Sequence, residues 1–178
     1  MTATITAPTV RTETATPTHT YDLGLLVLRL AVGLIMAAHG VQKLFGWFNG
    51  GGLDGTGKFF EMSGYPASKA MAAVAGLGET LGGLALAVGL LTPLAAAALV
   101  GTLLNAIAVK WDGGFFAPKG IEYELLLTLA AASLALTGPG RYAVDRAIAA
   151  LRNHRLIFGI AAIVLALVVA GGVLAVRN

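Results

Sequence analysis

The stretch that decides the fold is residues 28–47, LRLAVGLIMAAHGVQKLFGW. Most of it is apolar and typical of a helix that crosses a lipid bilayer. Arg29 and His39 nevertheless lie inside the apolar run, and Lys43 follows closely. Because ionisable side chains are costly in hydrocarbon, they are expected to face the interior of a helix bundle or a water-filled cavity. The stretch therefore predicts a membrane protein with polar groups inside it.

The composition of the whole chain indicates the same class. Of its 178 residues, 57% are hydrophobic and 12% are charged, and the mean hydropathy is +0.80. A soluble domain has about 25% charged residues, so this chain lacks the polar surface of one. The net charge of +3 is expected to orient loops at a membrane, not to bind nucleic acid. The chain has no cysteine, so any thiol chemistry must come from a partner.

Five apolar segments predict an all-α fold, a polytopic transmembrane helix bundle. They lie at about 23–44, 69–91, 94–110, 121–138 and 156–176. A full crossing takes about 20 residues, so the third and fourth segments are short and need aromatic or basic anchors at the interface. Pro93 separates the second segment from the third and predicts an antiparallel hairpin. The Thr-rich residues 1–21 are expected to form a disordered cytoplasmic tail.

The linkers predict an orientation in the membrane. Residues 45–68 and 111–120 are rich in glycine and aromatic residues, and both should lie at the headgroup level of one face. The linker 138–155 carries four arginines against one acid and is expected to form a short amphipathic helix on the cytoplasmic surface. This arginine cluster predicts a cytoplasmic N-terminus and an external C-terminus.

The first and second segments are expected to contact each other through polar groups. Arg29, His39 and Lys43 fall within about 80° of one another on a helix. Glu79 lies near the centre of the second segment, and the small residues around it predict a close approach by another helix. An antiparallel pairing brings the long Arg29 side chain within reach of Glu79, which predicts a structural ion pair. A proton relay is the alternative role of these two residues.

A polar pocket is expected in the outer half of the bundle, below the two aromatic linkers. The candidate ligand-binding residues are His39, Lys43, Glu79, Asn105, Lys110 and Glu124. The aromatic residues expected to cover a bound ring are Trp47, Phe48, Phe59, Phe60, Phe115 and Phe116. In the alternative interpretation, Lys43 and Lys110 only extend to the interface, and His39 is a hydrogen-bonded interior histidine. No metal site is expected, because His39 has no second histidine within reach in sequence.

Three stretches resemble the DoxX family of small bacterial membrane proteins. They are RLAVGLIMAAHGVQKLFGWF (29–48), GLGETLGGLALAVGLLTP (76–93) and GIEYELLLTLAAASLALTGPGRYAVD (120–145). The resemblance covers about residues 22–148 and implies a four-helix membrane domain in the bacterial inner membrane. Residues 149–178 would then be a basic linker and an extra C-terminal transmembrane helix. The alanine stripe of that helix packs either on the bundle or on another copy in a homo-oligomer.

Relatives in this family are linked to quinone-connected sulfur oxidation, to protection from quinones, and to membrane complexes with thiol and superoxide-handling enzymes. The resemblance therefore implies a protein that binds a small lipophilic ligand such as a quinone and supports redox defence against oxidative stress. Such a ligand suits apolar walls with a few hydrogen-bond donors at interfacial depth. His39 and Lys43 are expected to donate hydrogen bonds to its carbonyl oxygens, and Glu79 or Glu124 to exchange protons.

The electrons for such chemistry are expected to come from partner enzymes, because the chain has no flavin, haem or thiol motif. We therefore expect a subunit of a membrane oxidoreductase complex in place of a free-standing enzyme. One alternative is a structural or docking subunit whose polar groups only hold the bundle together. A second alternative is a small proton-coupled transporter, for which five helices and one central acid are few.

Overall fold

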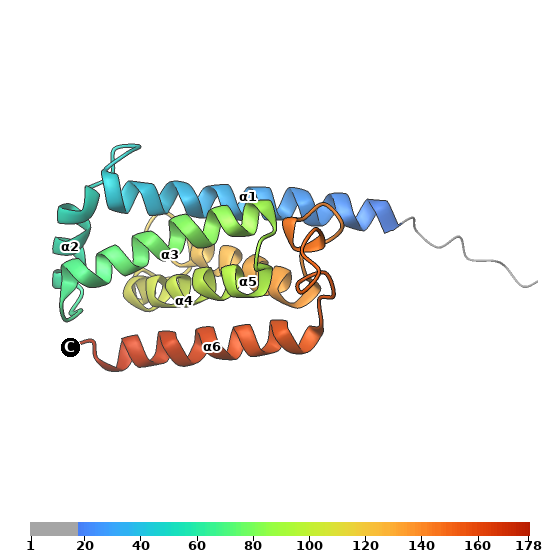
Figure 1. Cartoon of the computed structure of the whole chain (residues 1–178). Coiled ribbons are helices and arrows are strands. Elements are labelled where there is room, and N and C mark those ends of the chain that lie inside the picture. The colour runs from blue at the N-terminus through green and yellow to red at the C-terminus, as the bar shows by residue number, and fades with distance from the viewer. Residues whose placement is uncertain (1–17) are drawn as a thin grey trace, which may run out of the picture.

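The computed structural model describes residues 18–178, and all regular structure within them is helical (Figure 1). The elements are α1 (Thr18–Phe45), α2 (Gly52–Met62), α3 (Ser68–Val88), α4 (Thr92–Lys110), the 3₁₀ turn η1 (Trp111–Gly113), α5 (Glu122–Thr137), the 3₁₀ turn η2 (Val144–Arg146) and α6 (Leu156–Ala175). This confirms the all-α prediction. The expected N-terminal tail lies mostly outside the described residues, but residues 18–21 belong to α1 and not to the tail.

Within residues 18–178, four helical stretches are long and apolar enough to cross a membrane. They are His19–Phe45, Ser68–Val88, Thr92–Gly113 and Leu156–Ala175. The third is longer than expected, because η1 continues α4 directly. By contrast, α5 has only 16 residues, about 24 Å of helix, which is less than the roughly 30 Å thickness of the hydrocarbon core. The segment 121–138 is therefore helical as expected but falls short of a full crossing.

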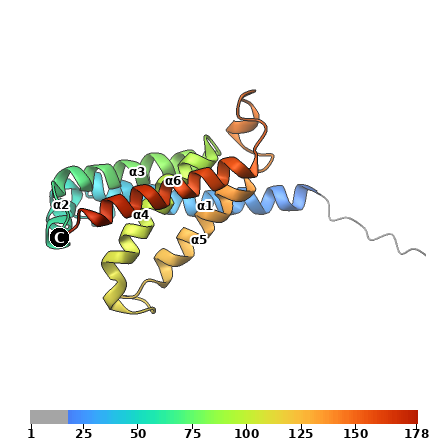
Figure 2. The ribbon, with the colours of Figure 1, turned by 90° about the horizontal axis from the view of Figure 1, so that it is seen from below.

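The helices form a bundle whose members differ in tilt. In Figures 1 and 2 the axes of α1, α3 and α6 are roughly parallel, with α3 antiparallel to the other two, whereas α4 and α5 slant away from them in Figure 2. Helix α4 packs against both α3 and α6, and α2 lies across the end of the bundle where α1 finishes. The C-terminus lies at this α2 end, and α1 begins at the opposite end, beside the 138–155 linker.

Helices α1 and α3 are in backbone contact. A Cβ atom added to Gly33 would lie 2.5 Å from the carbonyl oxygen of Gly83, and one added to Gly83 would lie 2.5 Å from that of Gly33. No side chain fits at such a distance, so glycine at both positions allows the helices to meet. This confirms the close approach that the small residues of α3 predict.

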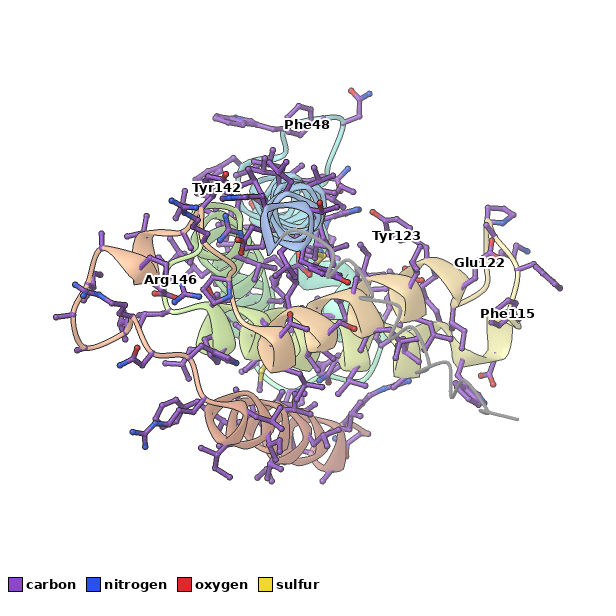
Figure 3. All side chains as sticks on the ribbon, turned by 90° about the vertical axis from the view of Figure 1, so that its right-hand side faces the viewer. Phe48, Phe115, Glu122, Tyr123, Tyr142 and Arg146 are labelled. Atoms are coloured by element: carbon purple, nitrogen blue, oxygen red, sulfur yellow. The ribbon has the colours of Figure 1, made fainter. Side chains whose placement is uncertain are left out.

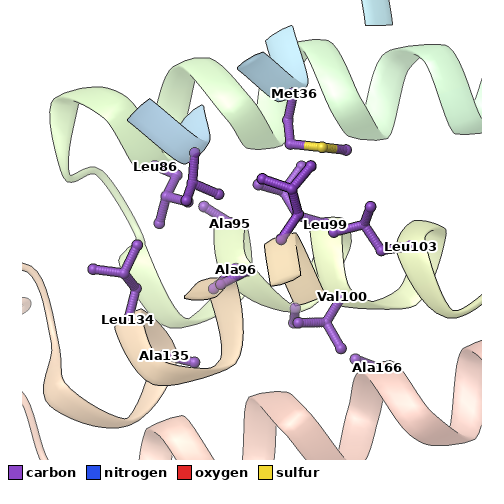
Figure 4. Packing of buried hydrophobic residues seen from close by; sticks show 14 of the residues in the cluster. Met36, Leu86, Ala95, Ala96, Leu99, Val100, Leu103, Leu134, Ala135 and Ala166 are labelled. Atoms are coloured by element: carbon purple, nitrogen blue, oxygen red, sulfur yellow. The ribbon is translucent and has the colours of Figure 1, made fainter. Parts of the chain in front are cut away.

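The apolar core joins five helices of the part of the chain that the structure describes. Met36, Leu86, Leu99 and Leu134 come from α1, α3, α4 and α5 and meet at the centre of the bundle (Figure 4). Helix α6 joins this core through its alanine stripe, Ala162, Ala166 and Ala170, which is at most 3% exposed. The stripe faces α4 and α5 of the same chain, so of the two expected arrangements the structure shows packing on the bundle.

The linker 138–155 is not the expected amphipathic helix. Apart from the short η2 turn, it consists of turns and irregular backbone. The reason lies in its contacts: Arg146 donates from Nε to the Gly140 carbonyl at 3.2 Å and from Nη1 to the Arg152 carbonyl at 3.2 Å. These two hydrogen bonds fold the linker back on itself. An amphipathic helix would instead have kept its polar side chains along one face.

The C-terminus is fastened to the opposite end of the bundle. Arg177 donates from Nε to the Ser63 carbonyl at 2.7 Å, and the Asn178 backbone N–H donates to the Gly64 carbonyl at 2.9 Å. Ser63 and Gly64 lie in the turn between α2 and α3. The end of α6 is therefore held beside α2.

Candidate functional site

Lys43, and not Arg29, is the partner of Glu79. The Lys43 Nζ lies 2.5 Å from Glu79 Oε2, and the two side chains are 26% and 5% exposed. A carboxylate so deeply buried requires a charged or hydrogen-bonded partner, and Lys43 supplies it from the last turn of α1. The Lys43–Glu79 pair lies inside the bundle, as expected of polar groups on α1 and α3.

The predicted Arg29–Glu79 ion pair is wrong because the register of the two helices differs from the expected one. An Arg29–Glu79 pair needs a register in which Glu79 lies level with about Leu34, five residues from Arg29. In the structure, Gly40 of α1 packs against α3 about one turn before Glu79, since a Cβ added to Gly40 would lie 2.7 Å from the Gly76 carbonyl oxygen. This contact places Glu79 level with the residues around His39. The shift of about five residues, roughly 7.5 Å along the axis, carries Glu79 away from Arg29.

Arg29 instead holds the 138–155 linker. Its side chain is almost fully buried, and it donates from Nη1 to the Pro139 carbonyl at 2.7 Å and from Nη2 to the Tyr142 carbonyl at 2.5 Å. Gly89, whose φ is +72°, lies directly against the guanidinium, where a Cβ atom would collide with it. Arg29 is therefore a structural brace between α1 and the linker, at the end of the bundle opposite α2.

The start of α4 is capped by Asp145, which sequence reasoning counted only as the acid of a basic linker. Its Oδ1 accepts from the Leu91 backbone N–H at 2.7 Å, and its Oδ2 accepts from the Thr92 N–H at 3.0 Å and the Thr92 hydroxyl at 2.8 Å. The carboxylate thus satisfies N–H groups that a helix start leaves unpaired. No spacing rule links residues so far apart in sequence, so the pattern of the chain gave no signal.

A cavity of about 510 Å³ lies between α2, α3, α4 and α6. Its walls are mostly apolar and include Phe59 and Phe60 of α2. The polar side chains that line it are Lys43, Tyr65, Glu79, Thr102, Asn105 and Lys110. Both the volume and the small number of polar groups are typical of sites for small organic ligands. The cavity therefore contains four of the six predicted ligand-binding residues and two of the six predicted aromatic ones.

The polar groups around the cavity are already engaged with one another. The Tyr65 hydroxyl donates to Asn105 Oδ1 at 3.1 Å, and Lys110 Nζ lies 2.7 Å from Glu124 Oε1. Burial raises the pKa of the Tyr65 phenol, although the nearby Arg177 opposes the shift, so at neutral pH the hydroxyl is protonated and able to donate. Tyr65 was not among the predicted residues, because it lies in a turn where no helical period points to it.

The remaining predicted residues do not belong to this cavity. His39 lines a second, smaller cavity of about 290 Å³ together with Phe48 and Tyr123, and its Nε2 lies 3.3 Å from the Tyr123 hydroxyl. Trp47, Phe115 and Phe116 are 60%, 51% and 76% exposed and line neither cavity. Figure 3 shows Phe48 at the top of the view and Phe115 at its right-hand edge.

The two acids at the start of α5 have different partners. Glu124 pairs with Lys110 beside the cavity, while Glu122 accepts from the Ala117 backbone N–H at 2.8 Å and shapes the linker before α5. The single outward pocket expected from the sequence is therefore divided. One part lies between α3, α4 and α6, and the other lies between α1 and α5.

The fold and this arrangement define a class: a polytopic α-helical membrane protein with paired ionisable side chains around a largely apolar cavity. The DoxX family model matches residues 24–111. The chain is 35% identical over 126 residues to "Putative oxidoreductase CatD" of Bacillus subtilis, covering 70% of this chain and 87% of that protein. It is 32% identical over 133 residues to "Uncharacterized membrane protein Rv3486" of Mycobacterium tuberculosis, covering 68% and 78%. The chain belongs to the DoxX family. No solved structure matches it significantly.

Proposed function

We propose that this protein binds a quinone-like molecule in the cavity between α2, α3, α4 and α6 and supports quinone- or thiol-linked redox defence together with partner enzymes. The observation that carries the proposal is the cavity itself: about 510 Å³, apolar along most of its wall, with the Lys43–Glu79 pair and the Tyr65–Asn105 pair on its lining. A quinone needs flat apolar surroundings and a few donors for its carbonyl oxygens, and both are present here.

The side chains of the cavity suit the proton side of such chemistry. The Lys43 ammonium has donors left over after its bond to Glu79 and can donate to a carbonyl oxygen beside it. Glu79, held next to Lys43, is the acid placed to exchange a proton with a ligand. Reduction of a quinone also requires electrons, and the chain has no cysteine to carry them. A partner enzyme supplies the electrons in this proposal, which makes the protein a ligand-binding subunit.

The relatives and the charge distribution support the setting. The Bacillus subtilis relative carries the name "Putative oxidoreductase CatD", which favours a redox role here. The 138–155 linker, with its four arginines, lies at the same end of the bundle as the start of α1. By the positive-inside rule this end is cytoplasmic in the bacterial inner membrane, and the α2 end with the C-terminus is external.

Binding of a defined quinone tests the proposal. The probe is a tritiated benzoquinone with a ten-carbon tail, measured on purified protein in lipid nanodiscs. Glu79→Gln is expected to weaken binding by about tenfold, equivalent to about 1.4 kcal/mol, because it removes the charge that holds Lys43 in place. Glu122→Gln is the control, since Glu122 bonds only to the linker backbone and lies outside the cavity. Equal binding by both variants would contradict the proposed site.

A structural or docking subunit is the second candidate, and one observation favours it: Glu79 and Lys110 already have partners within the protein. In that case wild-type protein binds no quinone, and Glu79→Gln lowers the amount of folded protein in the membrane. Quinone binding by the wild type together with unchanged abundance of Glu79→Gln separates the two candidates.

A further inference from the structure

The large cavity is elongated, and its two ends differ in polarity. Leu94 and Lys110 both line it, and they are 16 residues apart on α4, which corresponds to about 24 Å. The α2 end holds Lys43, Tyr65 and Lys110. The residues that line the far end are apolar: Leu94, Ala97, Ala98, Leu165 and Ala166. A site polar at one end and apolar at the other matches an amphiphile with a head and a tail.

The cavity is also open along one side. Val74 of α3 and Val169 of α6 line it, yet they are 67% and 54% exposed. Helix α4 packs against both α3 and α6, while α3 and α6 hardly touch each other, and α4 slants away toward its C-terminal end (Figure 2). Val74 and Val169 lie within the stretches Ser68–Val88 and Leu156–Ala175, which are long and apolar enough to cross a membrane, so in a bilayer the opening is expected to face the acyl chains.

The floor of this opening is made of residues too small to fill it. A Cβ atom at Gly78 would meet nothing closer than the Thr102 hydroxyl, at 3.8 Å, and one at Gly101 would meet the Ala166 carbonyl oxygen at 3.7 Å. By contrast, glycines in the contact between α1 and α3 leave no room at all. The open glycines therefore leave space along the groove that helix packing does not use.

We infer that the groove between α3 and α6 holds the hydrocarbon tail of a single-tailed lipophilic ligand, which enters sideways from the bilayer with its head toward α2. The identity of the head group as a quinone rests on the proposed function. The tail site follows separately from the apolar end and the open side. Helix α6, which lies outside the region matched by the family model, forms one wall of the groove.

The test uses two neighbouring valines of α6. Val169 lines the groove and Val168 does not, although they are 54% and 66% exposed. Val169→Trp is expected to weaken binding of the ten-carbon-tailed benzoquinone at least tenfold and to change binding of the tailless benzoquinone less than twofold. Val168→Trp is expected to change neither. Val74→Trp blocks the groove from the α3 side and repeats the test if Val169→Trp folds poorly.

A photoreactive decanol with a diazirine, which has the tail but no quinone, separates this inference from the proposed function. It is expected to label wild-type protein on α3, α4 or α6, and Val169→Trp or Val74→Trp should remove that label. If neither quinone binds while decanol still labels the groove, the proposed function fails and the tail site stands. If the tailed quinone binds equally to the Val169→Trp, Val74→Trp and Val168→Trp variants, the inference is overturned and the proposed function stands.

Discussion

At the scale of single residues, the interior of the bundle is organised by charges that each have a specific partner. Lys43 pairs with Glu79, Lys110 pairs with Glu124, and Arg29 donates to two backbone carbonyls. Each partner offsets part of the cost of holding an ionisable group inside a membrane protein. Removing one member of a buried pair leaves the other uncompensated, so the pairs have measurable energetic coupling.

Double-mutant analysis of the Lys43–Glu79 pair is expected to show this coupling. Glu79→Ala and Lys43→Met each destabilise the protein by about 1–3 kcal/mol, because each leaves a polar partner unpaired. The double variant should lose less than the sum, with a coupling energy of about 1 kcal/mol. The measurement is the free energy of unfolding by sodium dodecyl sulfate in mixed micelles.

Arg29 provides the control for that cycle. Because Arg29 bonds to Pro139 and Tyr142 and not to Glu79, the effects of Arg29→Lys and Glu79→Ala should add to within about 0.5 kcal/mol. Strong coupling between Arg29 and Glu79, with additive effects for Lys43 and Glu79, would refute the observed register of α1 and α3.

Sequence pattern was sufficient to identify the polar residues but not their partners. Helical period places Arg29, His39 and Lys43 on one stripe of α1, and all three do make polar contacts. The partner of Glu79 depends on how far α1 slides along α3. That register is set by the backbone contact between Gly33 and Gly83. Both helices contain many other small residues, so the sequence allows several registers equally well.

At the scale of elements, contacts between residues far apart in sequence hold the start of α4 and the end of α6. Asp145, from the 138–155 linker, caps the first turn of α4 and is 3% exposed. Arg177 anchors the end of α6 to the turn after α2. These contacts fix the two ends of the bundle, and neither follows from local sequence.

Asp145→Ala is expected to lower the free energy of unfolding by about 1–2 kcal/mol, since it removes a side-chain cap from α4. Asp112→Ala is the matched control, because Asp112 is exposed in the η1 turn and should change stability by less than about 0.5 kcal/mol. Both are measured by the same detergent titration. Similar losses for the two variants would show that the Asp145 cap contributes nothing.

Helix prediction succeeded where apolar runs are long and failed where tertiary contacts decide. The segments that became α1, α3 and α6 are long apolar runs, and composition alone is enough to find them. The third segment is short in the sequence and reaches spanning length as α4 because η1 continues it. The 138–155 linker has the composition of an amphipathic helix, but Arg29 and the start of α4 take its carbonyls and its one acid. These tertiary contacts outweigh the local helix propensity of the linker.

At the scale of the whole molecule, the tilt of α4 creates the site. Because α4 leans away from α3 and α6 toward the α2 end, a cavity forms there and collects Lys43, Glu79 and Asn105. Sequence reasoning placed these residues in one pocket, but it joined His39 and four exposed aromatic residues to them. The tilt of the helices and the choice of neighbouring helices separate His39 and these aromatic residues from the cavity. The sequence pattern predicts neither the tilt nor the neighbours.

We propose that a quinone-like ligand occupies the cavity between α2, α3, α4 and α6. The most direct test is photolabelling in nanodiscs with a diazirine-bearing benzoquinone, followed by mass spectrometry of the labelled peptides. We expect labels on peptides of α3, α4 and α6 near Glu79, Asn105 and Val169, and excess unlabelled quinone should suppress them. Labels confined to the peptides that contain His39, Phe48 and Tyr123, or labels that excess quinone leaves unchanged, would contradict it.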